Sequence, residues 1–486
     1  MQLPQEFIEY ATDALGEHVA QRLFAEIEKG CDSTSIRVNS HKGVTVGELD
    51  AAEGCTPVKW SGMGYYLPQR PVFTLDPLFH AGAYYVQEAS SMYMELAAKA
   101  VGKHYALMHD ECTGADDNCA GEFFSRQLDV LDLCAAPGGK TTHLSSLISE
   151  NSLLVANEVI KSRSVVLADN VAKWGADNIV VTNSDPADFK AFEGFFDLVV
   201  VDAPCSGEGL FRKESEAIGE WSPANVNLCA QRQQRILADI WPALKSGGYL
   251  VYSTCTYNKF ENDGNLEYMC NTFGAEVVSL DLSQESGIIA TAKGGAQFVP
   301  GQVQGEGQFM AVLYKPVTDD RVLRPHKHKK DGKKGKGKDE QPEKGCKYLP
   351  DNYMMTLNGD LVKGYRKPLY ERIRFVEENL ICVLSGIAVA NKKGKDYIPH
   401  ADFALQGIVA RMAAEGKLPD GIAAVDTDRD TALKFLAKEA ILLPGAPAGY
   451  VLLVYKGLGI GFVKNLGNRT NNLLPMARRI RMQING

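Results

Sequence analysis

The chain has 486 residues and a formal net charge of −8 at pH 7, with 45% hydrophobic and 23% charged residues. That length is too great for one hydrophobic core, so we expect a globular protein of several domains. The negative net charge excludes a protein coated in basic surface, and any polyanionic partner must therefore bind local basic patches. The sequence has no run of about 18 apolar residues, so we expect no membrane span.

The cysteines indicate a reducing compartment. Eleven of them are scattered through the chain without a Cys-x-x-Cys pair. A disulfide framework or a zinc cage would cluster them, so we expect reduced thiols and no bound metal. The first ten residues lack the basic start and the apolar run of a signal peptide. These features together predict a cytoplasmic protein.

Residues 1–75 predict a small α+β module. Apolar residues recur at helical spacing over 6–15 and 17–28, which indicates a pair of amphipathic helices. Alternation of apolar and polar residues over 35–39 indicates a strand. The periodicity of this module does not indicate its function.

Strands and helices alternate in the next part of the chain, which we expect to form one domain over residues 76–318. Such alternation predicts a doubly wound, Rossmann-like α/β sheet with helices on both faces. The strands are continuous apolar runs, which is typical of parallel strands buried on both sides. We expect strands at 130–134, 153–159, 179–182, 197–202 and 248–254, helices at 87–100, 140–149, 162–174, 223–244 and 259–272, and a final antiparallel edge strand at 308–314.

Two polar stretches interrupt and follow this domain. Residues 110–121 form a glycine-bearing insertion with Cys112 and Cys119, which we interpret as an exposed loop because no second cysteine pair accompanies them. Residues 319–345 are expected to form a flexible linker, since seven lysines occur among the twelve residues 327–338. We interpret the linker either as a solvated tether or as a phosphate-binding tract, and the two roles are compatible.

The last part of the chain predicts a small β-rich module. Residues 346–394 are expected to form a bridging segment with one short helix at 368–378. Residues 395–486 alternate short strands with two helices and contain a β-hairpin. We expect helices at 403–413 and 427–437, hairpin strands at 449–455 and 460–464, and a cationic face with Arg469, Arg478, Arg479 and Arg481.

A glycine-bearing turn begins the expected parallel sheet. The segment 132–142, Asp-Leu-Cys-Ala-Ala-Pro-Gly-Gly-Lys-Thr-Thr, follows a strand and opens a helix. In an open α/β sheet, a turn at this position lets backbone amides contact a ligand. The segment lacks both the Gly-x-Gly-x-x-Gly pattern of dinucleotide enzymes and the spacing of a P-loop. It therefore suits a nucleoside that bears a carboxylate.

Three acidic residues end successive strands after this turn. Glu158 lies twenty residues past Gly138, where an acid commonly accepts two ribose hydroxyls. Asp185 and Asp202 end the next two strands, so all three acids are expected along one crevice. With the turn they predict a site for S-adenosylmethionine, in which Arg163 is a weaker candidate. The predicted cofactor-binding residues are Cys134, Ala135, Ala136, Pro137, Gly138, Gly139, Lys140, Glu158, Asp185 and Asp202.

Two cysteines follow strands that are expected at the same edge of the sheet. A buried strand ends at Asp202 and is followed by Cys205, and Cys255 closes another strand fifty residues later. A single cysteine at a strand end is more often a packed core thiol. Two thiols and a carboxylate at one edge indicate covalent chemistry instead.

These segments resemble the motifs of the RNA cytosine-5 methyltransferases in order and approximate spacing. The similar segments are 132–142, 202–209 (Asp-Ala-Pro-Cys-Ser-Gly-Glu-Gly), 253–255 (Ser-Thr-Cys) and, before the sheet, 87–92 (Gln-Glu-Ala-Ser-Ser-Met). The resemblance covers about residues 1–315. The module at 395–486 resembles a PUA-type RNA-binding domain.

The resemblance implies an enzyme that methylates carbon 5 of a cytosine in small-subunit ribosomal RNA, with S-adenosylmethionine as the methyl donor. It implies that Cys255 attacks carbon 6 of the base as the nucleophile. Asp202 would hydrogen-bond the base, and Cys205 would assist loss of the carbon 5 proton. We expect the enzyme to act as a monomer.

Other functions share parts of this pattern. An exocyclic-amine methyltransferase would end the fourth strand with Asn or Asp followed by Pro-Pro and an aromatic residue, whereas this strand ends Asp-Ala-Pro-Cys. A non-catalytic RNA-binding factor for ribosome assembly could retain the fold, and transfer RNA is an alternative substrate. Arg212 and Lys213 follow the Cys205 turn, where we expect them either to hold an RNA phosphate or to be solvated.

Overall fold

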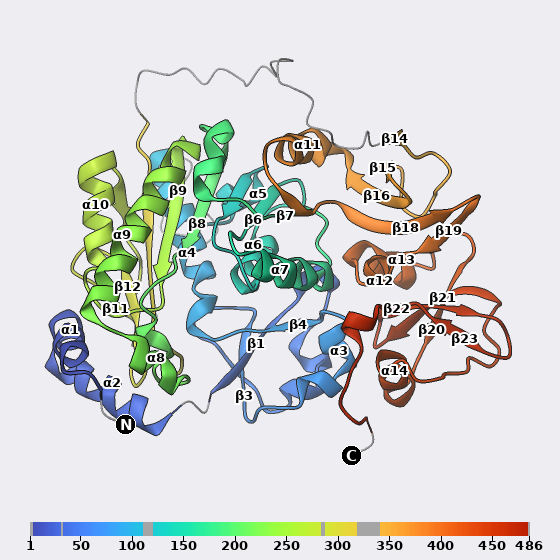
Figure 1. Cartoon of the computed structure of the whole chain (residues 1–486), viewed down its shortest axis with the longest axis horizontal. Helices are drawn as coiled ribbons and strands as arrows, with labels where there is room; N and C mark the ends of the chain where they lie inside the picture. The colour runs from blue at the N-terminus through green and yellow to red at the C-terminus, as the bar shows by residue number, and fades with distance from the viewer. Residues whose placement is uncertain (1–2, 31–32, 110–119, 283–286, 318–340, 485–486) are drawn as a thin grey trace.

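The computed structural model describes residues 3–30, 33–109, 120–282, 287–317 and 341–484. A large central sheet with helices on both faces occupies one half of the molecule, and smaller sheets lie below it and at its side (Figure 1). Cys112, Cys119 and most of the predicted lysine-rich linker lie outside the described residues. None of the described helices has both the length and the apolar character that a membrane span requires.

The two N-terminal helices occur where the spacing of apolar residues predicts them, as α1 (Gln5–Leu15) and α2 (Glu17–Lys29). Their buried faces pack on the central domain. Phe7 contacts Phe211 and Trp221, with ring centroids 4.9 and 5.9 Å apart. The helix pair therefore covers a segment of the central domain, away from its own sheet (Figure 1).

The N-terminal sheet has the antiparallel order β2-β3-β1-β4. It extends past the predicted module boundary at residue 75, because β4 pairs with β1. Ile36 and Val38 share a hydrophobic cluster with Phe435 and Val451, so the two ends of the chain form a common core. The elements of this region are β1 (Thr34–Val38), β2 (Thr56–Pro57), β3 (Gly64–Leu67), α3 (Pro77–His80) and β4 (Tyr84–Val86).

The central sheet has the strand order β11-β12-β13-β9-β8-β5-β6-β7-β17, and β10 also pairs with β13. Its five middle strands are parallel, as their continuous apolar runs predict. The strand order reverses beside β5, and open α/β sheets bind ligands in the crevice at such a point. The strands are β5 (Asp129–Asp132), β6 (Leu153–Asn157), β7 (Ile179–Thr182), β8 (Phe196–Asp202), β9 (Leu244–Thr254), β10 (Glu276–Val278), β11 (Ile289–Ala290), β12 (Ala296–Phe298), β13 (Gln308–Tyr314) and β17 (Cys382–Leu384).

Alternate residues of the buried strands face two separate cores. Val200 and Leu154 pack in the cluster beneath α4, α6 and α7, whereas Val199 and Leu153 pack against α9, α10 and α11. Because the side chains on both faces of these strands are apolar, helices pack on both faces of the sheet. The helices are α4 (Met94–Met108), α5 (Ala120–Ser125), α6 (Gly139–Leu147), α7 (Lys161–Trp174), α8 (Ser215–Glu220), α9 (Pro223–Ile240), α10 (Asp263–Phe273) and α11 (Tyr370–Asn379).

Two predictions for this domain are wrong in detail. The helix expected from residue 87 begins only at Met94, because the chain first forms a short 3-10 turn at Ser90–Met92. The strand expected at the edge of the sheet, β13, is antiparallel as predicted, but it is not an edge strand. β12 pairs with its outer side, so the sheet continues beyond it.

Residues 346–394, predicted only to bridge two modules with one helix, contain most of a five-stranded sheet. Its order is β14-β15-β16-β18-β19. β17 leaves this region and pairs with β7, so the C-terminal half completes the edge of the central sheet. The strands are β14 (Gln341–Pro342), β15 (Tyr353–Asn358), β16 (Leu361–Arg366), β18 (Ile387–Lys393) and β19 (Asp396–Pro399).

The predicted C-terminal hairpin forms part of a four-stranded sheet of order β20-β21-β22-β23. The predicted helix at 403–413 is divided into two short helices. Arg478 does not belong to an open cationic face, because its guanidinium lies 2.8 Å from Asp169 and 2.6 Å from Asp402. The elements are α12 (Ala401–Ala404), α13 (Gly407–Ala414), β20 (Ile422–Asp426), α14 (Arg429–Leu436), β21 (Gly449–Tyr455), β22 (Leu458–Asn465) and β23 (Thr470–Asn472).

Candidate active site

The ends of β8 and β9 bring the two predicted thiols together. These strands are parallel neighbours, with Asp202 opposite Ser253, so the residues after each strand emerge at the same edge. The Sγ atoms of Cys205 and Cys255 lie 2.9 Å apart, and the Cys255 amide donates to Cys205 Sγ at 3.3 Å. Both cysteines are half-buried free thiols.

The surroundings of the Cys205 sulfur favour its protonated form. The hydrogen bond with Cys255 and the burial of the site raise the pKa of the Cys205 thiol well above its usual range. Cys205 therefore keeps its proton at neutral pH. Since a protonated thiol is a poor nucleophile, Cys205 in this state does not attack.

A buried carboxylate joins the two loops that carry the thiols. Glu208, in the loop after β8, is 1% exposed and accepts from the Thr256 hydroxyl at 2.5 Å. The same oxygen accepts from the amides of Tyr257 and Asn258 at 2.7 and 3.1 Å. Its other oxygen accepts from the Asn258 side chain at 2.8 Å and from Trp221 Nε1 at 3.0 Å. Glu208 thus fixes the loop after β9 to the loop after β8.

A second carboxylate supports the same junction. Glu261 accepts from the Ser206 amide at 3.0 Å and from Gln233 Nε2 at 2.7 Å. Its other oxygen accepts from Asn258 Nδ2 at 2.9 Å. Burial raises the pKa of Glu261, and several donors act against this effect. The two glutamates and their donors form one buried network around the thiol pair.

Asp202 lies between the thiol loops and the predicted cofactor turn. Its Oδ1 accepts from the Ser253 hydroxyl at 2.6 Å, and that hydroxyl accepts from the buried Tyr93 phenol at 2.5 Å. Its Oδ2 accepts from Lys140 Nζ at 2.8 Å. Burial opposes the charge of Lys140, but the Asp202 carboxylate and other nearby acidic groups together raise the Lys140 pKa. The Lys140–Asp202 ion pair therefore connects the turn to the strand ends.

The turn before α6 has the form that the sequence predicts. Gly138 has a φ of 113°, in the region that favours glycine, and α6 begins at the next residue. The Arg163 guanidinium donates to the Ala136 carbonyl at 2.8 Å, and Asn170 Nδ2 donates to the Pro137 carbonyl at 2.8 Å. The first turn of a helix leaves amide groups without partners inside the helix, and they attract anions. The turn therefore suits a carboxylate.

The side of the crevice next to β6 suits a nucleoside. Glu158 follows β6, is 3% exposed, and accepts from the Ile160 amide at 2.9 Å. Val159 and Ile160 beside it are 55% and 49% exposed, which is unusual for large apolar residues next to a buried acid. An adenine ring would cover them. This apolar pair is not among the predicted cofactor-binding residues, although its position directly after the strand-ending acid is a usable signal in the sequence.

S-adenosylmethionine fits this set of groups. The start of α6 and Lys140 offer positive charge for its carboxylate, and Glu158 offers an acceptor for its ribose. Cys134 lies within the turn, and burial raises the pKa of its thiol. The thiol therefore stays protonated and unreactive. Asp185, also predicted to bind the cofactor, caps a 3-10 helix: its Oδ1 accepts from the Ala187 amide at 3.0 Å.

Neither of the roles predicted for Arg212 fits its surroundings. Its side chain is 8% exposed, and its guanidinium lies 3.0 Å from Glu306 and 3.7 Å from Glu26. Lys213 Nζ lies 3.6 Å from the same Glu306. These ion pairs tie the segment after Cys205 to α2 and to the loop before β13, so Arg212 serves the structure rather than a phosphate.

Three protein-family models match the chain. The model of 16S rRNA methyltransferase RsmB/F matches residues 125–314, and that of the N-terminal domain of 16S rRNA methyltransferase RsmF matches residues 3–89. The model of the methyltransferase RsmF PUA domain matches residues 423–480. The predicted fold, a Rossmann-like methyltransferase sheet with an N-terminal module and a C-terminal PUA-like module, is confirmed.

Two curated relatives match almost the whole chain. Ribosomal RNA small subunit methyltransferase F of Shewanella baltica (strain OS155 / ATCC BAA-1091) is 33% identical over 501 residues, which cover 98% of this chain and 96% of the relative. The protein of the same name from Shewanella sp. (strain MR-4) is 31% identical over 492 residues, which cover 98% of this chain and 97% of the relative.

Solved structures match the catalytic part. A methyltransferase homolog protein from Pyrococcus horikoshii has a TM-score of 0.52 and 25% identity, and the match covers 64% of this chain and 95% of that one. NSun6 from Pyrococcus horikoshii, solved with SFG, shares the fold with a TM-score of 0.50 and 19% identity over 64% of this chain and 98% of that one. With its full-length relatives and its cofactor crevice, the chain belongs to the ribosomal RNA small subunit methyltransferase F family of S-adenosylmethionine-dependent methyltransferases.

Proposed function

We propose that this enzyme transfers a methyl group from S-adenosylmethionine to carbon 5 of a cytosine in small-subunit ribosomal RNA, through a covalent bond between Cys255 and the base. The observation that carries the proposal is the thiol pair, whose Sγ atoms lie 2.9 Å apart. Methylation at carbon 5 needs a nucleophile first and a proton acceptor later. Two cysteines at the strand ends next to Asp202 supply both.

The first step makes the base nucleophilic. Carbon 5 of cytosine does not attack a methyl group by itself, but a thiolate that adds to carbon 6 turns the ring into an enamine. Cys255 forms this bond, and nitrogen 3 takes up a proton from solvent as the ring gains negative charge. The Asp202 carboxylate accepts from that N–H and from the exocyclic amine of the base. The ion pair with Lys140 at 2.8 Å keeps the Asp202 carboxylate oriented. Bound at the turn, S-adenosylmethionine supplies the electrophilic methyl group.

The last step restores the aromatic ring. After methylation, carbon 5 still carries its proton, which Cys205 removes while the electron pair of that bond expels the Cys255 sulfur from carbon 6. For this, Cys205 must first lose its own proton to solvent. The hydrogen bond with Cys255 is the largest cause of the raised Cys205 pKa. That bond is lost once the Cys255 sulfur is joined to carbon, so deprotonation of Cys205 becomes easier in the adduct.

The relatives and the C-terminal module support ribosomal RNA as the substrate. The relatives are named for the small ribosomal subunit, and the PUA domain model matches the end of the chain. The alternatives are transfer RNA as the substrate, or a non-catalytic role in ribosome assembly. A monomer and a cytoplasmic location stay predictions. The eight described cysteines are all free.

The test is methylation of separated small-subunit RNA and transfer RNA by the purified chain with radiolabelled S-adenosylmethionine, followed by nucleoside analysis. We expect 5-methylcytidine in the small-subunit RNA. Cys255→Ala should abolish transfer, whereas Cys270→Ala on α10 should leave it intact. N4-methylcytidine would contradict the thiol mechanism, and label only in transfer RNA would contradict the substrate. RNA binding without any transfer would favour the assembly factor.

A further inference from the structure

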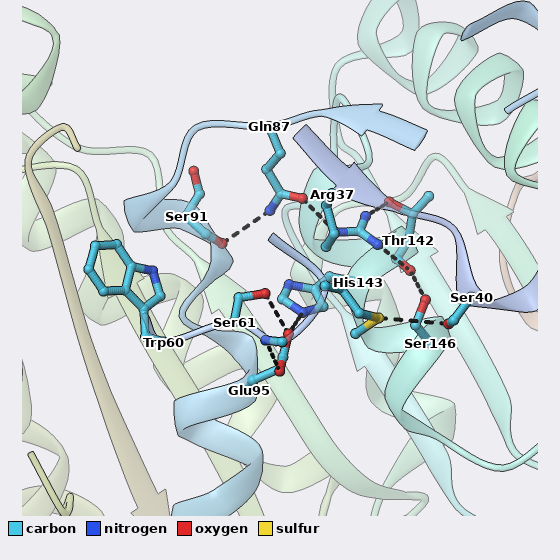
Figure 2. Close-up of polar contacts among 12 residues, drawn as sticks. Arg37, Ser40, Trp60, Ser61, Gln87, Ser91, Glu95, Thr142, His143 and Ser146 are labelled. Carbon is cyan, nitrogen blue, oxygen red and sulfur yellow. Dashed lines mark hydrogen bonds and ion pairs between the residues drawn. The ribbon is translucent and has the colours of Figure 1, made fainter. Parts of the chain in front are cut away.

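Arg37 is a buried cation that the proposed reaction does not use. It lies on β1 of the N-terminal module and is 0% exposed. Its guanidinium reaches the first turn of α6 in the central domain, where Figure 2 shows it between Gln87 and Thr142. A fully buried arginine is rare, because burying a charge without a partner is energetically costly.

The partners of Arg37 among the described residues are neutral. Nε donates to the Gln87 side-chain oxygen at 2.8 Å. Nη2 donates to the Thr142 hydroxyl at 2.5 Å and to the Gly139 carbonyl at 3.2 Å. The guanidinium also lies over the Trp174 ring, 4.5 Å from its centroid. These contacts orient the guanidinium without neutralising its charge.

The charge of Arg37 persists at neutral pH. Burial lowers the pKa of Arg37 to about 9, and the more distant Tyr85 and Glu95 side chains act in the opposite direction. Glu95 is itself bound by His143 at 3.1 Å and by the Ser61 hydroxyl at 2.5 Å (Figure 2). A positive charge is therefore held directly behind the start of α6, and the Glu95 carboxylate that acts on it is hydrogen-bonded to His143 and Ser61.

The N-terminal module binds two carbonyl groups of the cofactor turn directly and the one between them through Thr142 of α6. Tyr85 donates to the Pro137 carbonyl at 3.2 Å, and Arg37 donates to the Gly139 carbonyl. The Thr142 hydroxyl accepts from Arg37 and donates to the Gly138 carbonyl at 2.7 Å. In a planar trans peptide the N–H points opposite to the C=O. The amide groups of the turn therefore point away from the N-terminal module.

We propose that Arg37 is a positioning residue for the carboxylate of S-adenosylmethionine: it holds the turn with its amide groups toward the crevice and adds positive charge behind them. A fixed cation near amide groups at a helix start stabilises a bound anion. The inference rests on the cofactor and on its place at the turn, and it is independent of which base is methylated. It gives the N-terminal module a part in cofactor binding.

The test is isothermal titration calorimetry of the full-length chain, without RNA, against two ligands. One is S-adenosylmethionine, and the other is decarboxylated S-adenosylmethionine, which lacks only the carboxylate. Arg37→Met, which removes the charge and the donors, should raise the Kd for S-adenosylmethionine about tenfold or more. It should change the Kd for the decarboxylated ligand less than about twofold. Arg37→Lys, which keeps the charge, should give an intermediate Kd.

Matched variants separate this role from a general loss of structure. Arg366→Met removes a half-buried arginine that joins the C-terminal half to Asp177 at 2.8 Å, and it should leave both Kd values unchanged. Tyr85→Phe removes only the hydroxyl that holds the Pro137 carbonyl, and it should weaken S-adenosylmethionine alone, by about fivefold. If Arg37→Met does not fold, Arg37→Lys and Tyr85→Phe decide the question in the same way.

Two results would overturn the proposal. Equal weakening of both ligands by these variants would mean that Arg37 supports the fold without regard to the carboxylate. Unchanged binding of both ligands would mean that the turn does not need Arg37. If the unmodified chain bound neither ligand, the proposed function itself would fail, and that outcome is distinct because it involves no variant.

Discussion

The two ends of the crevice are held in place by different parts of the chain. At the thiol end, Glu208 follows Cys205 in the chain and accepts from the amide of Tyr257 in the loop of Cys255. Glu261 follows Cys255 and accepts from the amide of Ser206 in the loop of Cys205. At the cofactor end, Arg37 comes from another module, more than a hundred residues earlier in the chain. The carboxylates that join the two thiol loops therefore come from those loops themselves, whereas the cofactor end depends on how β1 of the N-terminal module docks.

The largest effect should follow from breaking the thiol end alone. Glu208→Ala leaves buried donors without an acceptor and frees the loop that carries Cys255. Since a displacement of about 1 Å can cost roughly a hundredfold in rate, we expect kcat to fall about a hundredfold or more. The Kd for S-adenosylmethionine, measured by calorimetry, should stay within about twofold because the turn is held separately.

The exposed Glu267 on α10 offers a matched control, since Glu267→Ala removes a carboxylate from the same domain without touching the network. It should leave kcat unchanged. A normal kcat in Glu208→Ala, or an equal loss of cofactor affinity in that variant, would show that the two ends are not independent.

The next effect concerns a buried acid beneath the cofactor turn. Asp132 is 0% exposed, and its Oδ2 accepts from the Thr141 hydroxyl at 2.7 Å. Burial raises the pKa of Asp132 to about 7. Between about pH 4 and pH 7 the folded chain therefore keeps a proton that the unfolded chain has lost, so this group makes stability fall as pH rises, by about 1.4 kcal/mol per pH unit.

Asp132→Asn removes this titration. Its melting temperature relative to the unmodified chain should therefore rise steadily from pH 5 to pH 7, as measured by thermal unfolding without cofactor. Parallel pH profiles for the two proteins would mean that Asp132 is not protonated in the folded state. Asp132 would then be a charged part of the cofactor end.

The smallest effect should come from a second support of the cofactor turn. Arg163, on α7, is about half exposed, donates to the Ala136 carbonyl at 2.8 Å and lies 3.4 Å from Glu158. Arg163→Met should raise the Kd for S-adenosylmethionine about threefold and leave kcat at saturating cofactor unchanged. Arg232→Met on α9, also exposed, is the control. If Arg163→Met raised the Kd for S-adenosylmethionine more than Arg37→Met does, the main support of the cofactor turn would be α7 and not the N-terminal module.

The sequence predicts the parallel sheet, the turn and the thiol pair because each depends on short segments. The apolar runs that become β5 to β9 determine burial on both faces, and Gly138 permits the turn by its own conformation. The supports of the site could not be predicted in this way. Arg37 appears in sequence as one polar residue of an alternating strand, and only the docking of β1 against α6 places it at Gly139.

For Arg212, position in the sequence suggests a functional role that the structure does not support. Its place directly after the Cys205 turn suggests contact with RNA, yet Glu26 and Glu306 reach it from distant segments. The edge strand β17 and the separate five-stranded sheet β14-β15-β16-β18-β19 were missed for a similar reason. A short strand with little alternation of apolar and polar residues is stabilised mainly by pairing with a neighbouring strand, which for β17 is β7.

In the proposed mechanism, Cys255 bonds the base and Cys205 releases it. The most direct measurement is incubation of Cys205→Ala with small-subunit ribosomal RNA and S-adenosylmethionine, followed by denaturing electrophoresis and mass spectrometry of the RNA-linked peptide. Because the proton acceptor is missing, we expect a stable protein–RNA adduct attached at Cys255, and none with the double variant Cys205→Ala, Cys255→Ala. Normal turnover by Cys205→Ala, or an adduct attached at another residue, would contradict the account.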